Sequence, residues 1–169
     1  MSSPDVPDIS VREAGLSDAA RLETLARRIW TPHYAPIIGA AQVQYMLDSF
    51  QSEAAIRRDM ESGYIYEIAC LGGEPCGYSA VRSDSAALFL SKLYVGANCR
   101  GRGIARLLVS RAEERARQSG ASCIRLTCNK RNDGSLAAYA RFGFQITGEC
   151  VTPIGCGFVM DDFILEKAL

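Results

Sequence analysis

The sequence predicts a mixed α/β protein in which helices cover both faces of a single sheet. Hydrophobic residues make up 48% of the 169 residues, which is enough for one core and too many for a disordered chain. Segments in which apolar residues alternate are interspersed with segments in which they recur with the 3.6-residue helical period. No internal repeat, low-complexity block or flexible linker divides the chain, so we expect one domain over residues 1–169.

The N-terminal part is expected to contain one strand and three helices. Residues 8–14 alternate as in a half-buried strand, and Ser17 is a candidate N-cap for the helix that follows. Proline fits poorly in a helix interior, so we expect Pro32 to end this helix. Further helices are expected over about 40–50 and over 52–63.

A run of strands and then a long helix are expected in the middle of the chain. Residues 64–71 and 76–82 form a predicted hairpin around a two-glycine turn, and 86–95 form a longer, more buried strand. The clearest helical period in the chain runs from Ile104 to Gly120, where glycine is expected to end the helix.

The C-terminal part is expected to add three strands and one short helix. A strand over 122–128 leads to a helix over 133–142, which Gly143 ends. Two final strands are expected near 144–151 and 157–166. The resulting order, β-α-α-α-β-β-β-α-β-α-β-β, is that of a mixed α/β sandwich.

The composition argues against several classes of function. Lys and Arg number 19, and Asp and Glu number 19, so the formal charge is zero and gives no sign of a nucleic-acid partner. No apolar run approaches the roughly 20 residues that span a bilayer. The N-terminus also lacks the basic and apolar regions of a signal peptide. We therefore expect a soluble cytoplasmic protein that has no membrane partner.

The cysteines and the histidine do not form a pattern typical of a metal site. The seven cysteines include no CxxC pair, and the chain has one histidine, so a zinc site of the usual spacing is not predicted. We expect reduced thiols that mostly act as small core residues, and we expect no metal.

A glycine-rich loop at the start of the long helix is the most informative segment. It reads Val95-Gly-Ala-Asn-Cys-Arg-Gly-Arg-Gly-Ile-Ala-Arg106 and connects a buried strand to the helix. The backbone N–H groups and the helix dipole at such a junction favour a phosphate or pyrophosphate, which glycines allow the backbone to approach closely. Three arginines can add charge-assisted contacts, namely Arg100, Arg102 and Arg106.

Two common phosphate-binding loops fit this segment less well. A Walker loop ends in Gly-Lys-Ser or Gly-Lys-Thr, whereas this chain continues Gly103-Ile-Ala. The GxGxxG fingerprint of dinucleotide-binding folds has glycine where Arg106 stands, and here the loop follows an antiparallel hairpin. Considered alone, the loop leaves one alternative, a glycine-bearing helix start without a ligand.

A second segment narrows the choice of ligand. Arg100-Gly-Arg-Gly-Ile-Ala105 resembles the Arg/Gln-x-x-Gly-x-Gly/Ala signature of the GNAT superfamily of acyl-CoA-dependent N-acyltransferases. Asn132, Tyr139, Gly143 and Phe144 match a second signature of that family, Asn-x₆-Tyr-x₃-Gly-Phe, without gaps. The order of elements also resembles the family fold over nearly the whole chain.

The resemblance implies both an architecture and a co-substrate. The GNAT fold has a mixed, mostly antiparallel seven-stranded sheet that splays between strands 4 and 5, with helices on both faces. Acetyl-CoA is the implied co-substrate, with its thioester in the splay, its pyrophosphate on the glycine-rich loop and its pantetheine arm along strand 4. The residues implied for its binding are Leu93, Tyr94, Val95, Arg100, Gly101, Arg102, Gly103, Ile104, Ala105, Arg106, Asn132 and Tyr139.

Tyr139 occupies the family position of the general acid that protonates the leaving thiolate. A phenol has a reference pKa of about 10, so it is protonated at pH 7 and can donate to the sulfur. Packing of the ring beside Phe142 is the alternative interpretation. The resemblance further implies that a backbone N–H near Tyr94 or Val95 holds the thioester oxygen.

The sequence leaves the general base open. Many family members carry a carboxylate on a central strand, and on strand 4 this chain has Ser91 and Lys92. Glu67 in the second predicted strand is one candidate, with an ion-paired residue as the alternative. His33 is the other candidate, because it lies between the first two helices, a region that lines acceptor sites in this fold.

Several segments resemble a bacterial branch of the family that includes polyamine N-acetyltransferases. They are residues 29–34, 44–47, 90–95 and 157–167. In this interpretation aromatic side chains line a slot for an alkylamine, and carboxylates attract its cationic tail. The candidate residues are Trp30, Tyr34, Tyr45, Asp161 and Asp162, with core packing as the alternative for Trp30 and Tyr45.

The resemblance therefore implies an N-acetyltransferase that moves acetyl from acetyl-CoA to a primary amine of a small molecule. A polyamine is the acceptor that the bacterial branch implies. Acetylation of protein or peptide amines is one alternative, and a non-catalytic CoA-binding regulatory module is the other. The assembly is left open, with a homodimer as one option.

Overall fold

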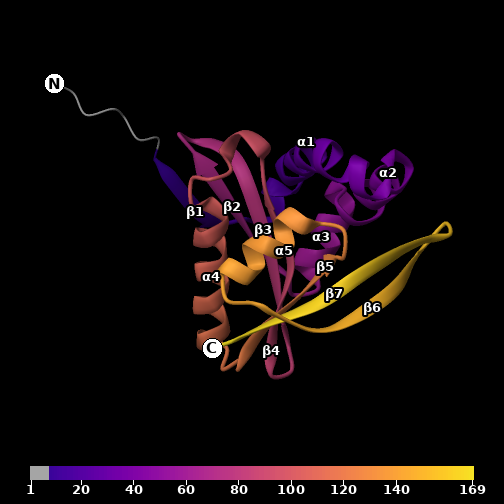
Figure 1. Cartoon of the computed structure of the whole chain (residues 1–169). Helices are drawn as coiled ribbons and strands as arrows, with labels where there is room; N and C mark the ends of the chain where they lie inside the picture. Colours follow the sequence, from indigo (N-terminus) through magenta and orange to yellow (C-terminus); the bar gives the residue numbers. More distant parts are fainter. Residues whose placement is uncertain (1–7) are drawn as a thin grey trace.

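The computed structural model describes residues 8–169, and these form one seven-stranded sheet with the order β1-β2-β3-β4-β5-β7-β6 (Figure 1). The strands are β1 (Ile9–Glu13), β2 (Ile65–Leu71), β3 (Glu74–Asp84), β4 (Ala87–Val95), β5 (Cys123–Asn129), β6 (Gln145–Gly155) and β7 (Phe158–Ala168). All neighbouring strands are antiparallel except β4 and β5, which are parallel. The mixed, mostly antiparallel seven-stranded sheet that the family resemblance implies is thus confirmed.

Five helices cover the two faces of this sheet. They are α1 (Ala19–Ile38), α2 (Ala40–Phe50), α3 (Glu53–Glu61), α4 (Ile104–Gln118) and α5 (Asp133–Arg141). The helices α1, α2 and α3 share one buried cluster with Tyr66, Ile68 and Tyr78 of the sheet. Helix α4 packs on the opposite face and shares a second cluster with α5, which lies in front of the sheet in Figure 1.

Strand β2 is buried on both faces of the sheet. Tyr66 and Ile68 pack into the cluster under α1, whereas Ala69 packs beside Ile104 at the start of α4. Glu67 also faces α4, where it meets Arg111. Because side chains alternate across a strand, a strand covered on both faces reads as a nearly continuous apolar run with a single charge.

The sheet splays between β4 and β5, as the resemblance implies. Residues 87–89 of β4 pair with residues 123–125 of β5, and no pairing follows beyond these positions in the described chain. Next to the opening, Ala80 pairs with Lys92 and Val81 pairs with Leu90. This register shift leaves Ser91 as the extra residue of a bulge, and such a bulge bends the strand and increases its twist.

The first helix differs from the prediction at both of its ends. Ser17 does not cap it; Gly15 and Asp18 frame a preceding 3₁₀ turn, and the Gly15 N–H donates to the Asp18 carboxylate at 2.9 Å. The expected end at Pro32 is also wrong, because α1 continues through Pro32 to Ile38. Packing of the later residues Tyr34 and Ile38 against the core offsets the hydrogen bond that proline removes.

The C-terminal hairpin is longer than predicted. Strand β6 continues past Val151 to Gly155, although a proline stands at position 153. A register shift between Pro153 and Gly155 accommodates this proline, which lies on an edge strand where one missing N–H is tolerated. The other predicted strands, and the helices over 40–50 and 133–142, agree with the structure to within two residues at each end.

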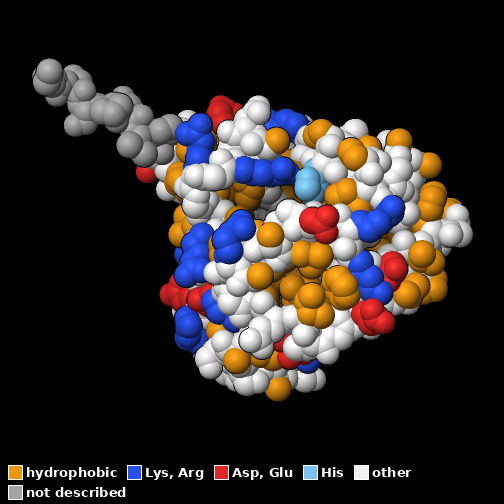
Figure 2. All heavy atoms as spheres, in the orientation of Figure 1, with side chains coloured by type: hydrophobic (Ala, Val, Ile, Leu, Met, Phe, Trp, Pro, Cys, Tyr) orange, Lys and Arg blue, Asp and Glu red, His pale blue; other side chains and the backbone are white. Residues whose placement is uncertain are grey.

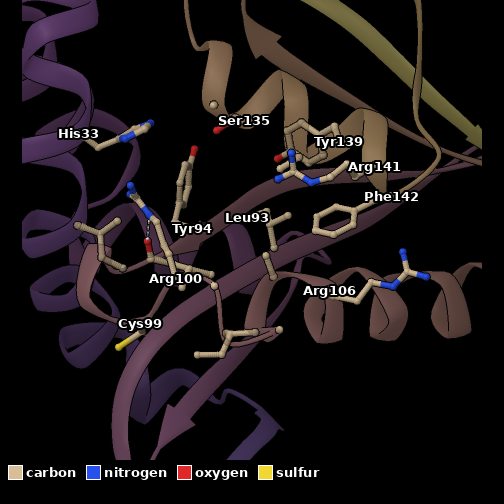
Figure 3. Close-up of a pocket in the computed structure, with 18 of the residues that line it drawn as sticks. His33, Leu93, Tyr94, Cys99, Arg100, Arg106, Ser135, Tyr139, Arg141 and Phe142 are labelled. Carbon is tan, nitrogen blue, oxygen red and sulfur yellow. Dashed lines mark hydrogen bonds between the residues drawn. The ribbon is translucent and has the colours of Figure 1, made fainter.

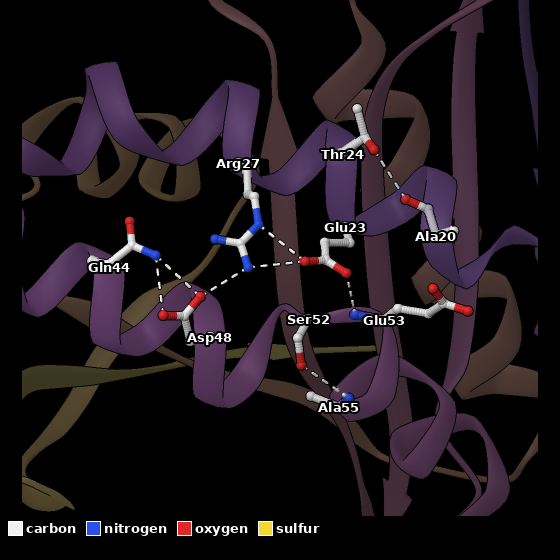
Figure 4. Close-up of polar contacts among 9 residues, drawn as sticks. All are labelled: Ala20, Glu23, Thr24, Arg27, Gln44, Asp48, Ser52, Glu53 and Ala55. Atoms are coloured by element: carbon white, nitrogen blue, oxygen red, sulfur yellow. Dashed lines mark hydrogen bonds and ion pairs between the residues drawn. The ribbon is translucent and has the colours of Figure 1, made fainter.

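A polar network ties the three N-terminal helices together (Figure 4). Glu23 of α1 accepts from Arg27 and, at 2.7 Å, from the backbone N–H of Glu53 at the start of α3. Arg27 also pairs with Asp48 of α2 at 2.8 Å. The Glu53 N–H and then Arg27 hold the pKa of Glu23 below its ordinary value. This network fixes α1, which carries one wall of the candidate site.

Within residues 8–169, no helix is both long enough and apolar enough to cross a membrane. The same residues contain no group of three His, Cys, Asp or Glu side chains placed to hold a metal ion. The seven cysteines are free thiols, and the exposed one, Cys156, lies in the turn between β6 and β7.

Candidate active site

Two adjoining pockets lie where β4 and β5 part. The larger pocket has a volume of about 480 Å³ and is lined by the end of β4, the loop before α4, α4, α5 and α1 (Figure 3). The smaller pocket, of about 100 Å³, is lined by α1, α2, β4, β5, α5 and β7. Five residues border both pockets: Tyr34, Leu93, Tyr94, Ser135 and Tyr139. A molecule in the larger pocket can therefore meet a second molecule in the smaller one at these residues.

The loop before α4 has the backbone geometry that favours an anion. Gly101 and Gly103 have φ values of 74° and 82°, which lie in the left-handed region where other residues are strained. The first helical bond of the turn runs from the Leu107 N–H to the Gly103 carbonyl. The N–H groups of residues 104–106 therefore lack partners within the helix and lie at its positive end.

Arginines surround this larger pocket. Arg100, Arg106 and Arg141 line it, and Arg100 Nε donates to the Val95 carbonyl at 3.2 Å (Figure 3). Arg102 is exposed and does not line the pocket. Arg141 belongs to neither motif and is not among the predicted residues, although it lies seven residues after Gly134, on the helical face of α5 that borders the pocket. On the face of the molecule that Figure 2 shows, apolar side chains gather at the centre, and Lys and Arg side chains lie on the side of α4.

The end of β4 presents free backbone groups to the splay. The Gly96 N–H donates to the Cys76 carbonyl on the β3 side at 2.8 Å. Because the direction of N–H groups alternates along a strand, the Val95 N–H points to the opposite, open side. The bond from Arg100 to the Val95 carbonyl lies on that same open side. An extended chain with amide groups can add to this edge like another strand.

Tyr139 lies on α5 at the junction of the two pockets. Its ring packs against Phe144, with 5.6 Å between the ring centroids. Burial raises the pKa of its hydroxyl, which keeps the phenol protonated at neutral pH. No group in residues 8–169 hydrogen-bonds to this hydroxyl, so it is free to donate to a molecule in the junction.

The smaller pocket combines aromatic walls with a buried carboxylate. Trp30 and Tyr34 of α1 line it, with 4.7 Å between their ring centroids. Asp162 of β7 also lines it and is 3% exposed. Burial, partly offset by a hydrogen bond with Thr127, raises the pKa of Asp162 to about 6.

Two other residues predicted for the acceptor lie outside this pocket. Asp161 precedes Asp162 on β7, so its side chain points to the opposite face, where it is exposed and pairs with Lys130 at 2.9 Å. Tyr45 donates to the Ile154 carbonyl at 2.5 Å and thereby fastens α2 to β6. The structure brings together Trp30, Tyr34 and Asp162, but neither Asp161 nor Tyr45.

His33 and Asn132 form a polar link between α1 and α5. His33 Nε2 lies 3.2 Å from Asn132 Oδ1, and the Asn132 amide donates to the Tyr34 hydroxyl at 3.3 Å. Burial and the nearby charge of Arg100 lower the pKa of His33, so that its ring is neutral at pH 7. His33 lines the larger pocket, whereas Asn132 is buried at the edge of the smaller one.

Glu67 lines neither pocket. It is 2% exposed and pairs with Arg111 at 2.9 Å and with Arg115 at 2.7 Å, both on α4. Arg115 also pairs with Glu13 of β1. This position agrees with the ion-paired alternative for Glu67 and gives no support to a role as general base.

We expect Glu67→Gln to unfold more easily while the folded protein keeps its turnover. The substitution leaves two arginines without their buried partner, which costs about 3 kcal/mol, at the lower end for such pairs because both arginines stay partly exposed. Urea unfolding measures this loss. Glu166→Gln, which breaks the more exposed pair with Arg125, is the control and should cost under about 1 kcal/mol. If Glu67→Gln were as stable as the wild type and its kcat fell strongly, Glu67 would be the general base after all.

Comparison with known proteins identifies the family of this site. The family model described as the acetyltransferase (GNAT) family matches residues 22–144, which includes the loop before α4 and Tyr139. The chain belongs to the GNAT acetyltransferase family. Membership confirms the family resemblance seen in the two motifs and makes the chain an acyltransferase by family. No curated protein matches it by sequence.

Solved structures described as acetyltransferases share the fold over nearly the whole chain. The PaiA N-acetyltransferase of Thermoplasma acidophilum, in complex with coenzyme A, is 20% identical with a TM-score of 0.81, over 96% of this chain and 99% of that one. A GCN5-related N-acetyltransferase of Rhodopseudomonas palustris has the same identity and TM-score, with coverage of 100% and 99%. YncA of Salmonella typhimurium, with its cofactor acetyl-CoA, is 19% identical with a TM-score of 0.63, over 95% and 94%.

Proposed function

We propose that this GNAT member transfers acetyl from acetyl-CoA to the primary amine of a small molecule, with Tyr139 as the general acid. The observation that carries the proposal is the meeting of two chemically different pockets at Tyr139. One has free helix N–H groups and arginines suited to a pyrophosphate. The other has aromatic walls and a carboxylate suited to a cationic amine.

In this proposal acetyl-CoA occupies the larger pocket. Its pyrophosphate rests on the N–H groups of residues 101–106, between Arg100 and Arg106. Its pantetheine arm runs along Leu93–Val95, and the Val95 N–H on the open edge holds the thioester oxygen. Hydrogen bonding there favours the negative charge that develops on this oxygen as the amine attacks. The family and the shape of the pocket both support this placement.

The chemistry is a direct attack of the amine on the thioester. The neutral amine nitrogen bonds to the carbonyl carbon, and the carbon–sulfur bond then breaks. Tyr139 gives its proton to the departing sulfur, so that free CoA leaves as a thiol. Burial raises the pKa of Tyr139, so the hydroxyl carries its proton throughout the physiological range and a proton is present to be given.

Among small amines, we propose polyamines as the first acceptors to test. Asp162 supports a cationic acceptor, since a buried carboxylate attracts an ammonium strongly. A volume of about 100 Å³ in the smaller pocket suits a slim alkylamine end. Asp161 adds no second carboxylate to this pocket, so the distal ammonium groups of a polyamine would remain near solvent.

A panel of amines at equal concentration tests this function. We expect release of free CoA thiol from acetyl-CoA to require an acceptor and to be faster with spermidine and butylamine than with an alanyl peptide. Faster turnover of the peptide would assign the enzyme to protein or peptide amines. Tight binding of acetyl-CoA without turnover of any amine would favour the non-catalytic module.

A further inference from the structure

Tyr139 is the candidate for the general acid of the reaction. Glu67 lies outside both pockets, so a candidate for the general base is still needed. Asp162 is a buried carboxylate in the pocket that the proposed amine would occupy. On β7 it pairs with Asn129 of β5, just where β5 has parted from β4. A carboxylate held out of water lowers stability unless a partner compensates for it, so its burial here calls for a function.

The other titratable groups of the smaller pocket cannot serve as the base. Those lining it are Tyr34, Tyr94, Cys128, Tyr139 and Asp162. Burial raises the pKa of the three tyrosines, and it raises the pKa of Cys128 to about 12, so all four stay protonated near neutral pH. Of the five titratable residues, Asp162 is therefore the one that is ionised at pH 7 and can accept a proton.

His33 is the competing base, and its position argues against it. It lines the larger pocket, on the side of the acetyl-CoA, and not the smaller one. Its Nε2 is already engaged with Asn132. The amine and Asp162 would share the smaller pocket, whereas His33 does not line it.

We propose that Asp162 is the general base that takes a proton from the attacking amine. This inference rests on the proposed acetyl transfer. As the nitrogen–carbon bond forms, the nitrogen loses one proton to the Asp162 carboxylate. As the carbon–sulfur bond breaks, Tyr139 protonates the sulfur. The proton on Asp162 then returns through solvent to the Tyr139 phenolate, and amine plus acetyl-CoA has become amide plus CoA thiol.

The charged surroundings of Asp162 set the expected pH dependence. Asp161, adjacent on β7, raises the pKa of Asp162, whereas Lys130 and the hydrogen bond with Thr127 lower it; burial is the largest effect. Because the base must be ionised, kcat should fall about tenfold per pH unit below about pH 6 and stay level above it.

Asp162→Asn tests the proposal against a matched neighbour, Asp161→Asn. We expect Asp162→Asn to lower kcat by about 10²–10⁴-fold at pH 7.5, with the affinity for acetyl-CoA unchanged and the fall below pH 6 gone. Asp162→Glu, which keeps a carboxylate, should recover part of the rate. Asp161→Asn should keep kcat at pH 7.5, since this residue faces away from the pocket, and should keep the fall in kcat at low pH, moved slightly to lower pH because Asp161 no longer raises the pKa of Asp162.

The midpoint of thermal unfolding shows whether the Asp162→Asn variant is folded. A raised carboxyl pKa means that ionised Asp162 destabilises the folded state above about pH 6, so Asp162→Asn should melt at or above the wild-type temperature at pH 8. A folded Asp162→Asn variant with kcat within twofold of wild type would overturn the proposal. A rise in KM alone would do the same, because Asp162 would then merely hold the ammonium.

Two further results separate this inference from the proposed function. Suppose that the fall in kcat below pH 6 disappears in His33→Gln but persists in Asp162→Asn. The general base would then be His33, and the proposed acetyl transfer would stand. Absence of amine turnover by the wild type would overturn the proposed function, and the base role with it.

Discussion

Tyr139→Phe is expected to lower kcat by about 10²–10⁴-fold while the dissociation constant of acetyl-CoA stays within about twofold. The substitution keeps the ring that packs on Phe144 and removes the hydroxyl that lies free at the junction of the pockets. Steady-state kinetics and calorimetric titration measure the two quantities separately.

Tyr45→Phe is the matched control for this loss of a hydroxyl. Tyr45 lies outside both pockets and bonds to the Ile154 carbonyl, so its variant should change stability slightly and leave kcat unchanged. A Tyr139→Phe enzyme with kcat within twofold of wild type would reduce Tyr139 to a packing residue.

Gly103→Glu is expected to weaken acetyl-CoA binding by about 10²–10³-fold. Nothing lies within 4 Å of an added Cβ, so the protein has room for a side chain, but that side chain would project at the anion site. Two like charges about 4 Å apart cost about 4 kcal/mol near a protein surface, which corresponds to roughly a thousandfold in affinity. Calorimetric titration with acetyl-CoA measures the change.

Gly120→Glu provides a control at the other end of the same helix. Gly120 has φ of 78°, against 82° for Gly103, and it too has nothing within 4 Å of an added Cβ. Both variants therefore carry similar backbone strain, about 1–2 kcal/mol. Gly120→Glu should nevertheless bind acetyl-CoA normally, and an equal loss in both variants would mean that strain, not the anion site, is responsible.

Local signals predicted most of the fold and most of the residues that line the larger pocket. Ser52, the first residue of the expected range 52–63, caps α3, and its hydroxyl accepts from the Ala55 N–H at 3.2 Å. Gly103 begins α4 in the left-handed conformation. These features depend on a few adjacent residues, so a single sequence contains the information needed to find them.

Features that depend on distant contacts were harder to predict. The continuation of α1 through Pro32 depends on packing of the following residues against the core, which no local pattern reports. The pairing of Glu67 with Arg111 and Arg115 joins residues more than 40 positions apart. The different faces of Asp161 and Asp162, by contrast, follow from strand alternation alone and were predictable.

The acceptor side of the site shows the same limit. Met46, Thr127 and Met160 border the smaller pocket from three separate elements, and none belongs to a recognisable motif. Their meeting depends on how far β4 and β5 splay and on how α2 packs over the opening. The motif residues that border the larger pocket, in contrast, lie in one loop and one helix.

The most direct test of acetyl transfer at this site is the stoichiometry of one reaction with carbon-13-labelled acetyl-CoA. Mass spectrometry of the amine and a free-thiol assay should show one labelled acetyl group on the amine for each CoA thiol released. Tyr139→Phe should lower both rates together. Thiol release without labelled amine, or labelled amine formed equally fast by Gly103→Glu at low acetyl-CoA concentration, would contradict the account.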